Sequence, residues 1–299
     1  MTYLKHILDS LYVTYDKNYL RTDPLQFAHC FSLPRDQEVT ALVSAALAYG
    51  NVKQIFASIR KILRIVGDSP HRFVKHFDPD RHTRLFDTFR HRFTGGRDVA
   101  LLLYYLRQVY ETYPSLEAFF LEHYSPSDES IEKGLTKFIE GMLALDCSPF
   151  YTGGLPRSSG IRYLLSSPLN GSACKRMNLF LRWMVRTEGG YDLGLWKHVS
   201  PSLLVLPLDT HTSRISRYIG LSSRRAPSWL MALEVTRRLR LYDPDDPVKY
   251  DFALSRLGIL DLCRHEYRMN ICSDCRLQDV CVHTGNSRSV SFHNRALAQ

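Results

Sequence analysis

The chain has 299 residues, enough for one large domain or two small ones, and its hydrophobic share of 44% can supply a core. No run of eighteen apolar residues occurs, and the charged start "MTYLKHILDSLYVTYDK" lacks the apolar core of a secretory signal. We therefore expect no membrane span and a cytoplasmic location with reduced thiols. The net charge of +9 favours polyanionic partners such as nucleic acid, although a scattered basic surface gives the same charge.

Apolar residues at helical spacing predict helices through most of the first half of the chain. Residues 36–50, "DQEVTALVSAALAYG", are apolar on nearly every face and predict a buried helix that ends at the glycine. An amphipathic stripe follows over 52–63, and a helix over 98–113 has Asp98 placed as its cap. The other predicted helices of this half start at capping serines: Ser115 and Ser130.

The second half begins with a loop over 146–172, rich in Gly, Ser and Pro, with a short helical piece at 161–165. Four helices are then predicted: 174–186, Asp209 to before Gly220, Ser228–Arg240, and a last one that has Pro247 in its first turn and leads towards Cys263. No internal repeat and no convincing ladder of strands is present. The predicted fold class is therefore all-α.

Four of the seven cysteines lie close together near the C-terminal end, with the spacing Cys263-x8-Cys272-x2-Cys275-x5-Cys281. Four thiolates suit either a [4Fe–4S] cluster or a tetrahedral zinc ion. Zinc ribbons and fingers commonly use two C-x2-C knuckles, and only one is present here. The spacing therefore favours the cluster, with zinc as the alternative.

This spacing resembles the iron–sulfur loop of the endonuclease III family, within the helix–hairpin–helix DNA glycosylase superfamily. That loop usually reads C-x6-C-x2-C-x5-C, so the last two gaps match and the first is two residues longer. The loop also carries basic residues that we expect to meet DNA phosphates. They are Arg264, His265, Arg268 and Arg276.

A second resemblance lies upstream, where "LPLDTHTSRISRYIGL" is similar to the superfamily segment "VDTHVxRVxxRLGL". The resemblance implies that Asp209 is the catalytic carboxylate. Asp209 is also a suitable N-cap for the helix that follows, and the two roles are compatible.

A third resemblance places "NGSACKRMNLFL" at the superfamily hairpin, so that Lys175 aligns with the Schiff-base lysine. The usual Gly-Val-Gly turn is absent, which leaves Gly171 as a turn residue expected near DNA. Asp209 follows Lys175 by 34 residues, a longer gap than is usual, because of an insert over 187–202. The archaeal 8-oxoguanine glycosylase branch has a similarly long gap. Lys197, in the insert, is the alternative lysine.

Further base or DNA contacts are expected after the first long helix, where the superfamily carries residues that enter the duplex or meet the flipped base. Tyr49 and Asn51 occupy that position, although Gly50 between them also explains it as a plain helix end. The tryptophans are stacking candidates or core residues. They are Trp183, Trp196 and Trp229.

The resemblance implies two helical lobes with a cleft between them. The first lobe is expected over 36–200, with a hairpin-like region at 166–186. The second lobe is expected to join residues 1–35 to 201–299 and to end in the iron–sulfur loop 263–281. The chain also resembles an uncharacterised bacterial family that shares the stretches "LRWMVR" and "DPVKYDFALxxLGI".

The function implied is a base-excision repair DNA glycosylase with AP-lyase activity, acting as a monomer on double-stranded DNA with an oxidised purine such as 8-oxoguanine. Such an enzyme is expected in the cytoplasm, at the nucleoid when bound to DNA. Two alternatives remain open. One is a non-catalytic iron–sulfur protein that binds nucleic acid, and the other is a zinc-stabilised helical interaction protein.

Overall fold

The computed structural model describes residues 3–264 and 266–284. Helices dominate this part of the chain, which confirms the all-α prediction. None of its helices is both long and apolar enough to cross a bilayer. The α-helices are α1 Tyr3–Thr14, α2 Pro34–Ala46, α3 Val52–Val66, α4 Pro70–Lys75, α5 Pro79–His82, α6 Gly96–Thr112, α7 Leu116–Leu121, α8 Glu132–Ala144, α9 Gly160–Leu164, α10 Lys175–Val185, α11 Thr210–Tyr218, α12 Trp229–Arg240, α13 Asp251–Ile259 and α14 Met269–Cys272.

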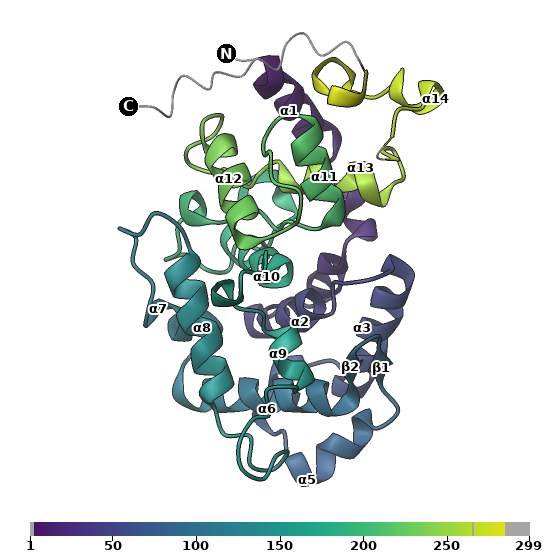
Figure 1. Ribbon diagram of the computed structural model, residues 1–299. Helices are drawn as coiled ribbons and strands as arrows, with labels where there is room; N and C mark the ends of the chain where they lie inside the picture. Colours follow the sequence, from purple (N-terminus) through teal and green to yellow (C-terminus); the bar gives the residue numbers. More distant parts are fainter. Residues whose placement is uncertain (1–2, 265, 285–299) are drawn as a thin grey trace.

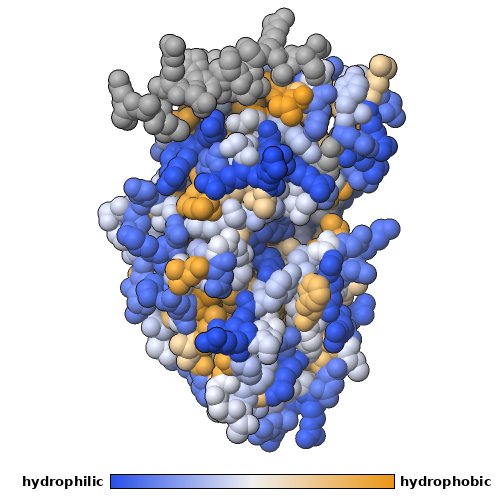
Figure 2. Space-filling view, in the orientation of Figure 1, coloured by the Kyte–Doolittle hydropathy of each residue, from blue (hydrophilic) through white to orange (hydrophobic). Residues whose placement is uncertain are grey.

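The helices gather at two ends of an elongated molecule (Figure 1). Helix α1 and helices α11 to α14 lie at the upper end, helices α2 to α9 lie at the lower end, and α10 lies between them. Helix α10 packs against α2, while α13 packs against both α11 and α1. The face drawn in Figure 2 is mainly hydrophilic, with hydrophobic residues in small separate patches. The division into lobes at residues 36–200 stays a prediction.

The helix starts predicted at Ser115 and Ser228 are confirmed, whereas α8 begins at Glu132 with Ile131, and not Ser130, as its N-cap. Ser115 accepts a hydrogen bond from the backbone N–H of Ala118 (2.9 Å), and Ser228 accepts one from Met231 (3.2 Å). Asp98, by contrast, is the third residue of α6 and not its cap, and it accepts from the N–H of Gly95 (2.9 Å). Both arrangements satisfy donors that have no partner inside a helix.

Two further predicted boundaries are wrong. Helix α2 ends at Ala46, so a short turn separates it from Gly50. Helix α13 begins at Asp251 and not near Pro247, because the preceding residues form turns. These turns place Asp246 against Arg186, the residue that follows α10, and no local sequence signal indicates this contact.

The core is apolar but contains a buried network of ion pairs centred on α10. Arg182 and Arg186 are each about 1% exposed and share Asp192, which the insert supplies. Arg182 also pairs with Asp251 of α13, and Arg186 pairs with Asp246 (2.8 Å). Buried charges require such partners. The network therefore ties α10, the insert and the start of α13 together.

The three tryptophans are core residues and are not available for stacking on a base. Trp183, Trp196 and Trp229 are between 0% and 3% exposed. Trp196, in the insert, donates through Nε1 to the buried carboxylate of Glu38 (2.7 Å). This bond fixes the insert against α2.

A small β-hairpin lies in the helical fold, and the sequence analysis missed it. Strand β1 (Arg90–His91) pairs antiparallel with β2 (Thr94–Gly95), and His91 stands opposite Thr94. Strands of two residues are too short to give the alternation by which strands are recognised in a sequence.

Candidate active site

A large cleft, with a volume of about 860 Å³, lies where the loop after α2, the starts of α10 and α11, and α13 meet. A volume of this size is typical of sites for small organic ligands. Both residues predicted to carry the chemistry, Lys175 and Asp209, line it. The fold therefore brings together two side chains that stand 34 residues apart in the sequence.

Lys175 is the first residue of α10 and lines the cleft. It follows Cys174, which has a left-handed backbone conformation (φ 47°) and turns the chain into the helix. The ammonium group of Lys175 donates to the backbone carbonyl of Ala48, at 3.1 Å. This bond holds the amine at the loop that follows α2.

Asp209 caps helix α11, as the sequence predicts. Its Oδ1 accepts a hydrogen bond from the backbone N–H of Thr212, at 2.9 Å. The helix dipole favours a negative charge at this end of the helix. Asp209 is only partly buried, so its carboxylate can serve as the cap and still face the cleft.

Asp251, another charged residue that lines the cleft, was not found from the sequence. Burial raises the pKa of its carboxyl group to about 6, against the opposing effect of its partner Arg182. Asp209 raises this pKa further and Lys175 lowers it, so the three groups act on one another across the cleft. The available signal was an acidic residue at the start of the apolar run "DFALSRLGIL".

The residues expected to contact DNA are only partly brought together. Tyr49 and Asn51 line the cleft, and Asn51 also caps α3 by accepting from the N–H of Lys53 (2.9 Å). Gly171 is exposed and is not one of the lining residues, although its neighbour Ser172 is. Lys197, the alternative lysine, is exposed and lies outside the cleft lining.

The four C-terminal cysteines line a second, smaller cavity between α11, the end of α13 and the loop that follows. Its other walls are largely apolar and include Ile215, Ile219 and Leu257. Burial raises the pKa of the thiols of Cys275 and Cys281, and the neighbouring thiols raise it further. Among the described residues, no three His, Cys, Asp or Glu side chains form a group that could hold a single metal ion.

The arginines predicted to contact phosphate have partners within the protein. Arg264 pairs with Asp261 (3.3 Å) and Arg268 with Glu266. Arg276 donates to the hydroxyl of Ser10 in α1 (2.9 Å). His265 lies outside the described residues. Phosphate binding by these groups stays a prediction.

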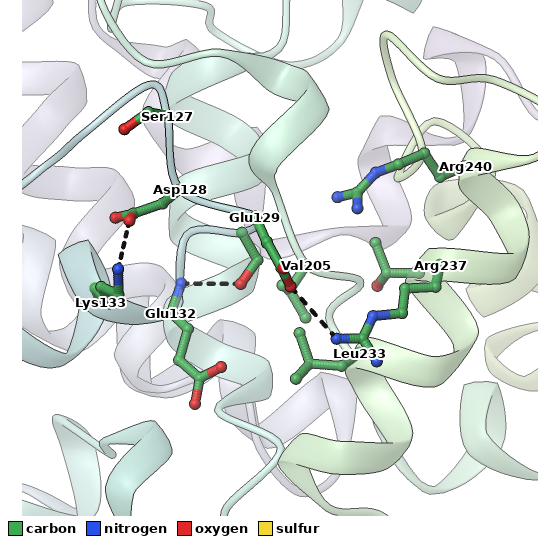
Figure 3. A pocket seen from close by; sticks show the side chains of 11 residues that line it. Ser127, Asp128, Glu129, Glu132, Lys133, Val205, Leu233, Arg237 and Arg240 are labelled. Carbon is green, nitrogen blue, oxygen red and sulfur yellow. Dashed lines mark hydrogen bonds and ion pairs between the residues drawn. The ribbon is translucent and has the colours of Figure 1, made fainter.

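Another cavity, of about 380 Å³, lies between the start of α8 and helix α12 (Figure 3). Its charged groups largely neutralise one another, since Lys133 pairs with Asp128 (2.7 Å) and Arg237 with Glu129 (3.8 Å). None of the predicted site residues lines this cavity, and it adds no chemistry to the site.

A mainly helical protein with a large cleft, whose lining includes Lys175 and the carboxylates of Asp209 and Asp251, is the class that this geometry defines. A family model described as "Protein of unknown function (DUF2400)" matches residues 23–260, most of the chain, and the protein therefore belongs to this family. The matched range contains Lys175, Asp209 and Asp251 and ends before Cys263. The comparisons with curated proteins and with solved structures found no match.

Proposed function

We propose that this protein is a DNA base-excision repair glycosylase with an associated AP-lyase activity, and that it acts on an oxidised purine such as 8-oxoguanine. The observation that carries the proposal is the presence of Lys175 and Asp209 in one cleft. The cleft is large enough for a nucleotide, and the net charge of +9 favours a polyanionic substrate. The choice of an oxidised purine comes from the resemblance to the archaeal 8-oxoguanine glycosylase branch.

The reaction uses the two side chains in different roles. A base inside a duplex shields its glycosidic bond, so the nucleotide must first rotate into the cleft. The lone pair of the Lys175 amine forms a bond to C1′ as the bond from C1′ to the base breaks, and the base leaves with a proton. Asp209 stabilises the positive charge that develops on the sugar. The sugar ring then opens as the bond from C1′ to O4′ breaks and O4′ takes a proton, which leaves an imine between Lys175 and C1′. In the β-elimination that follows, C2′ loses a proton to solvent and the 3′ phosphate departs with its oxygen, which breaks the strand.

The cysteine cavity has the right donors for a [4Fe–4S] cluster. Cys263, Cys272, Cys275 and Cys281 would supply four sulfur ligands, and all four line this cavity. The group would fold the loop around itself and stabilise the surface beside α11, with no part in bond breaking. Zinc remains the alternative occupant.

Borohydride trapping on a panel of lesion-bearing duplexes tests the chemistry, because it reduces an imine between lysine and C1′ to a stable adduct. The parent protein should be trapped on at least one lesion, and Lys175→Gln should not. Lys197→Gln is the matched control, because Lys197 is an exposed lysine outside the cleft lining, and it should trap as the parent does.

Duplex binding, measured in parallel, separates the possible failures. Lys175→Gln should bind almost as well as the parent, since one lost charge is a small part of a contact with many phosphates. Trapping that survives in Lys175→Gln would show that another lysine is the nucleophile. Binding without trapping by any variant would instead favour the non-catalytic alternative.

A further inference from the structure

The tip of the β1–β2 hairpin exposes a large aromatic side chain on a rigid support. Phe93 is 68% exposed, whereas His91 and Thr94 on either side of the tip are 2% and 0% exposed. Arg92, the other tip residue, has a left-handed backbone conformation (φ 52°) that suits a tight turn. The tip therefore presents Phe93 to solvent from a buried base.

The base of the hairpin is held by a set of buried hydrogen bonds. The hydroxyl of Tyr49 donates to the carbonyl of His91 (2.8 Å) and lies 2.6 Å from Oγ1 of Thr94. The two ring nitrogens of His91 bond to Ser58 (2.9 Å) and to the carbonyl of Tyr49 (3.1 Å). These bonds tie the hairpin to the loop after α2 and to α3, so the tip is positioned before any ligand arrives.

The hairpin tip stands at the rim of the cleft that contains Lys175. Arg92 and Tyr163 both line this cleft, and the ring of Phe93 packs edge-on against that of Tyr163, with centroids 5.9 Å apart. The guanidinium group of Arg176 lies 4.0 Å from the ring of Tyr163. Aromatic rings and arginines alternate here, an arrangement typical of surfaces that stack on bases next to phosphates.

We propose that Phe93 inserts into the base stack of a duplex bound at the cleft and fills the space left by the rotated nucleotide. This inference rests on the function proposed above and goes beyond it, because it names the side chain that opens the stack. Apolar wedges of this kind partly unstack neighbouring bases. Arg92 is then a cationic neighbour of the opened step.

The three native tryptophans make a direct test possible, because all are at most 3% exposed. Phe93→Trp therefore introduces an indole whose fluorescence acrylamide can quench, while the fluorescence of the buried native tryptophans stays shielded from acrylamide. We expect saturating duplex with an abasic-site analogue to reduce the acrylamide quenching constant at position 93 about fivefold or more, because a stacked indole is covered on both faces. The matched control is Leu241→Trp, at a position that is 80% exposed and does not line the cleft. Its quenching should not change.

Phe93→Ala supplies a second readout. Removing one stacking aromatic should slow base release from a paired lesion about tenfold or more. It should slow release much less when the lesion lies in single-stranded DNA, where there is no duplex stack to open. Phe93→Trp should restore the rate on the duplex.

The outcomes distinguish this inference from the proposed function. Binding is followed by the fluorescence anisotropy of a labelled duplex. If the duplex binds and the indole at position 93 is quenched as strongly as before, the proposed role of the hairpin is wrong and the proposed function is not affected. Protection at position 93 without base release on any lesion supports the hairpin and counts against the glycosylase. If the anisotropy of the duplex does not change when protein is added, the protein does not bind DNA, and both the hairpin's role and the proposed function are wrong.

Discussion

Asp209 combines a structural and a proposed chemical role, and substitution can separate them. Asparagine retains the side-chain oxygen that accepts from Thr212. The free energy of unfolding of Asp209→Asn should therefore lie within about 1 kcal/mol of that of the parent. The same change removes the charge that is proposed to stabilise the sugar cation, so base release should fall on the order of a hundredfold or more. Urea unfolding and single-turnover kinetics measure the two effects.

Asp209→Ala is the comparison, because it removes both the charge and the cap. It should cost about 0.5–2 kcal/mol of stability in addition to the loss of activity. An asparagine variant that is as unstable as the alanine variant would contradict this account of the cap.

Asp251 gives the fold a dependence on pH with a definite sign. Burial raises its pKa to about 6 in the folded protein, from an ordinary value of 3.8, so the folded state binds the proton more tightly than the unfolded state. The stability from this group is fully present below the ordinary value and is lost as pH rises through about 6, by about 3 kcal/mol. Asp251→Asn does not titrate, so the stability of the parent relative to this variant should fall between pH 4 and 7. Urea unfolding at several pH values measures the difference, and a constant difference would contradict the buried ionisation.

At the scale of the elements, helices with local signals could be predicted from the sequence. Asp209 and Ser228 cap their helices through bonds to residues three positions later. Such caps can be recognised from the local sequence, because only a few residue types can form them. The start of α13 could not be predicted, because it depends on the pairing of Asp246 with Arg186, 60 residues earlier. The site shows the same division. Lys175 and Asp209 lie in recognisable segments, whereas Asp251 belongs to the site only through folding.

The hairpin is the element that the sequence does not predict, and a substitution at Gly50 can test how the hairpin is held in place. Gly50 has φ +93°, and a Cβ there would come within 2.8 Å of the Arg92 side chain. Gly50→Ala should therefore cost about 1–3 kcal/mol of backbone strain and should also displace Arg92. The matched control is Gly67→Ala, because Gly67 has φ +72° but no atom within 4 Å of its added Cβ. Urea unfolding should show a loss in both, and only Gly50→Ala should weaken duplex binding.

At the scale of the whole molecule, the cluster proposed for the cysteine cavity would couple metal binding to the folding of the C-terminal end. Protein purified without oxygen should contain iron and sulfide, close to four irons per chain, as a [4Fe–4S] cluster requires. Cys272→Ser should lose the iron and also lower the unfolding midpoint, because binding energy in such loops is folding energy. Cys30→Ser is the control and should keep the iron, since Cys30 is exposed and does not line the cavity. Stoichiometric zinc without iron would contradict the cluster and would favour the alternative, a zinc ion bound by the four cysteines.

The packing of α1 has a consequence for synthesis on the ribosome. Helix α1 leaves the ribosome long before α13, yet the two helices pack together, and the hydroxyl of Ser10 accepts from Arg276 in the cysteine loop. Its apolar side chains, including Leu4, Leu8 and Leu11, cannot be covered by these partners until more than two hundred further residues have been translated. At roughly 5–20 residues per second, the helix waits on the order of 10–50 seconds. Nascent chains stalled before residue 251 should therefore bind chaperones through α1, and chains from which α13 and the cysteine loop have emerged should not.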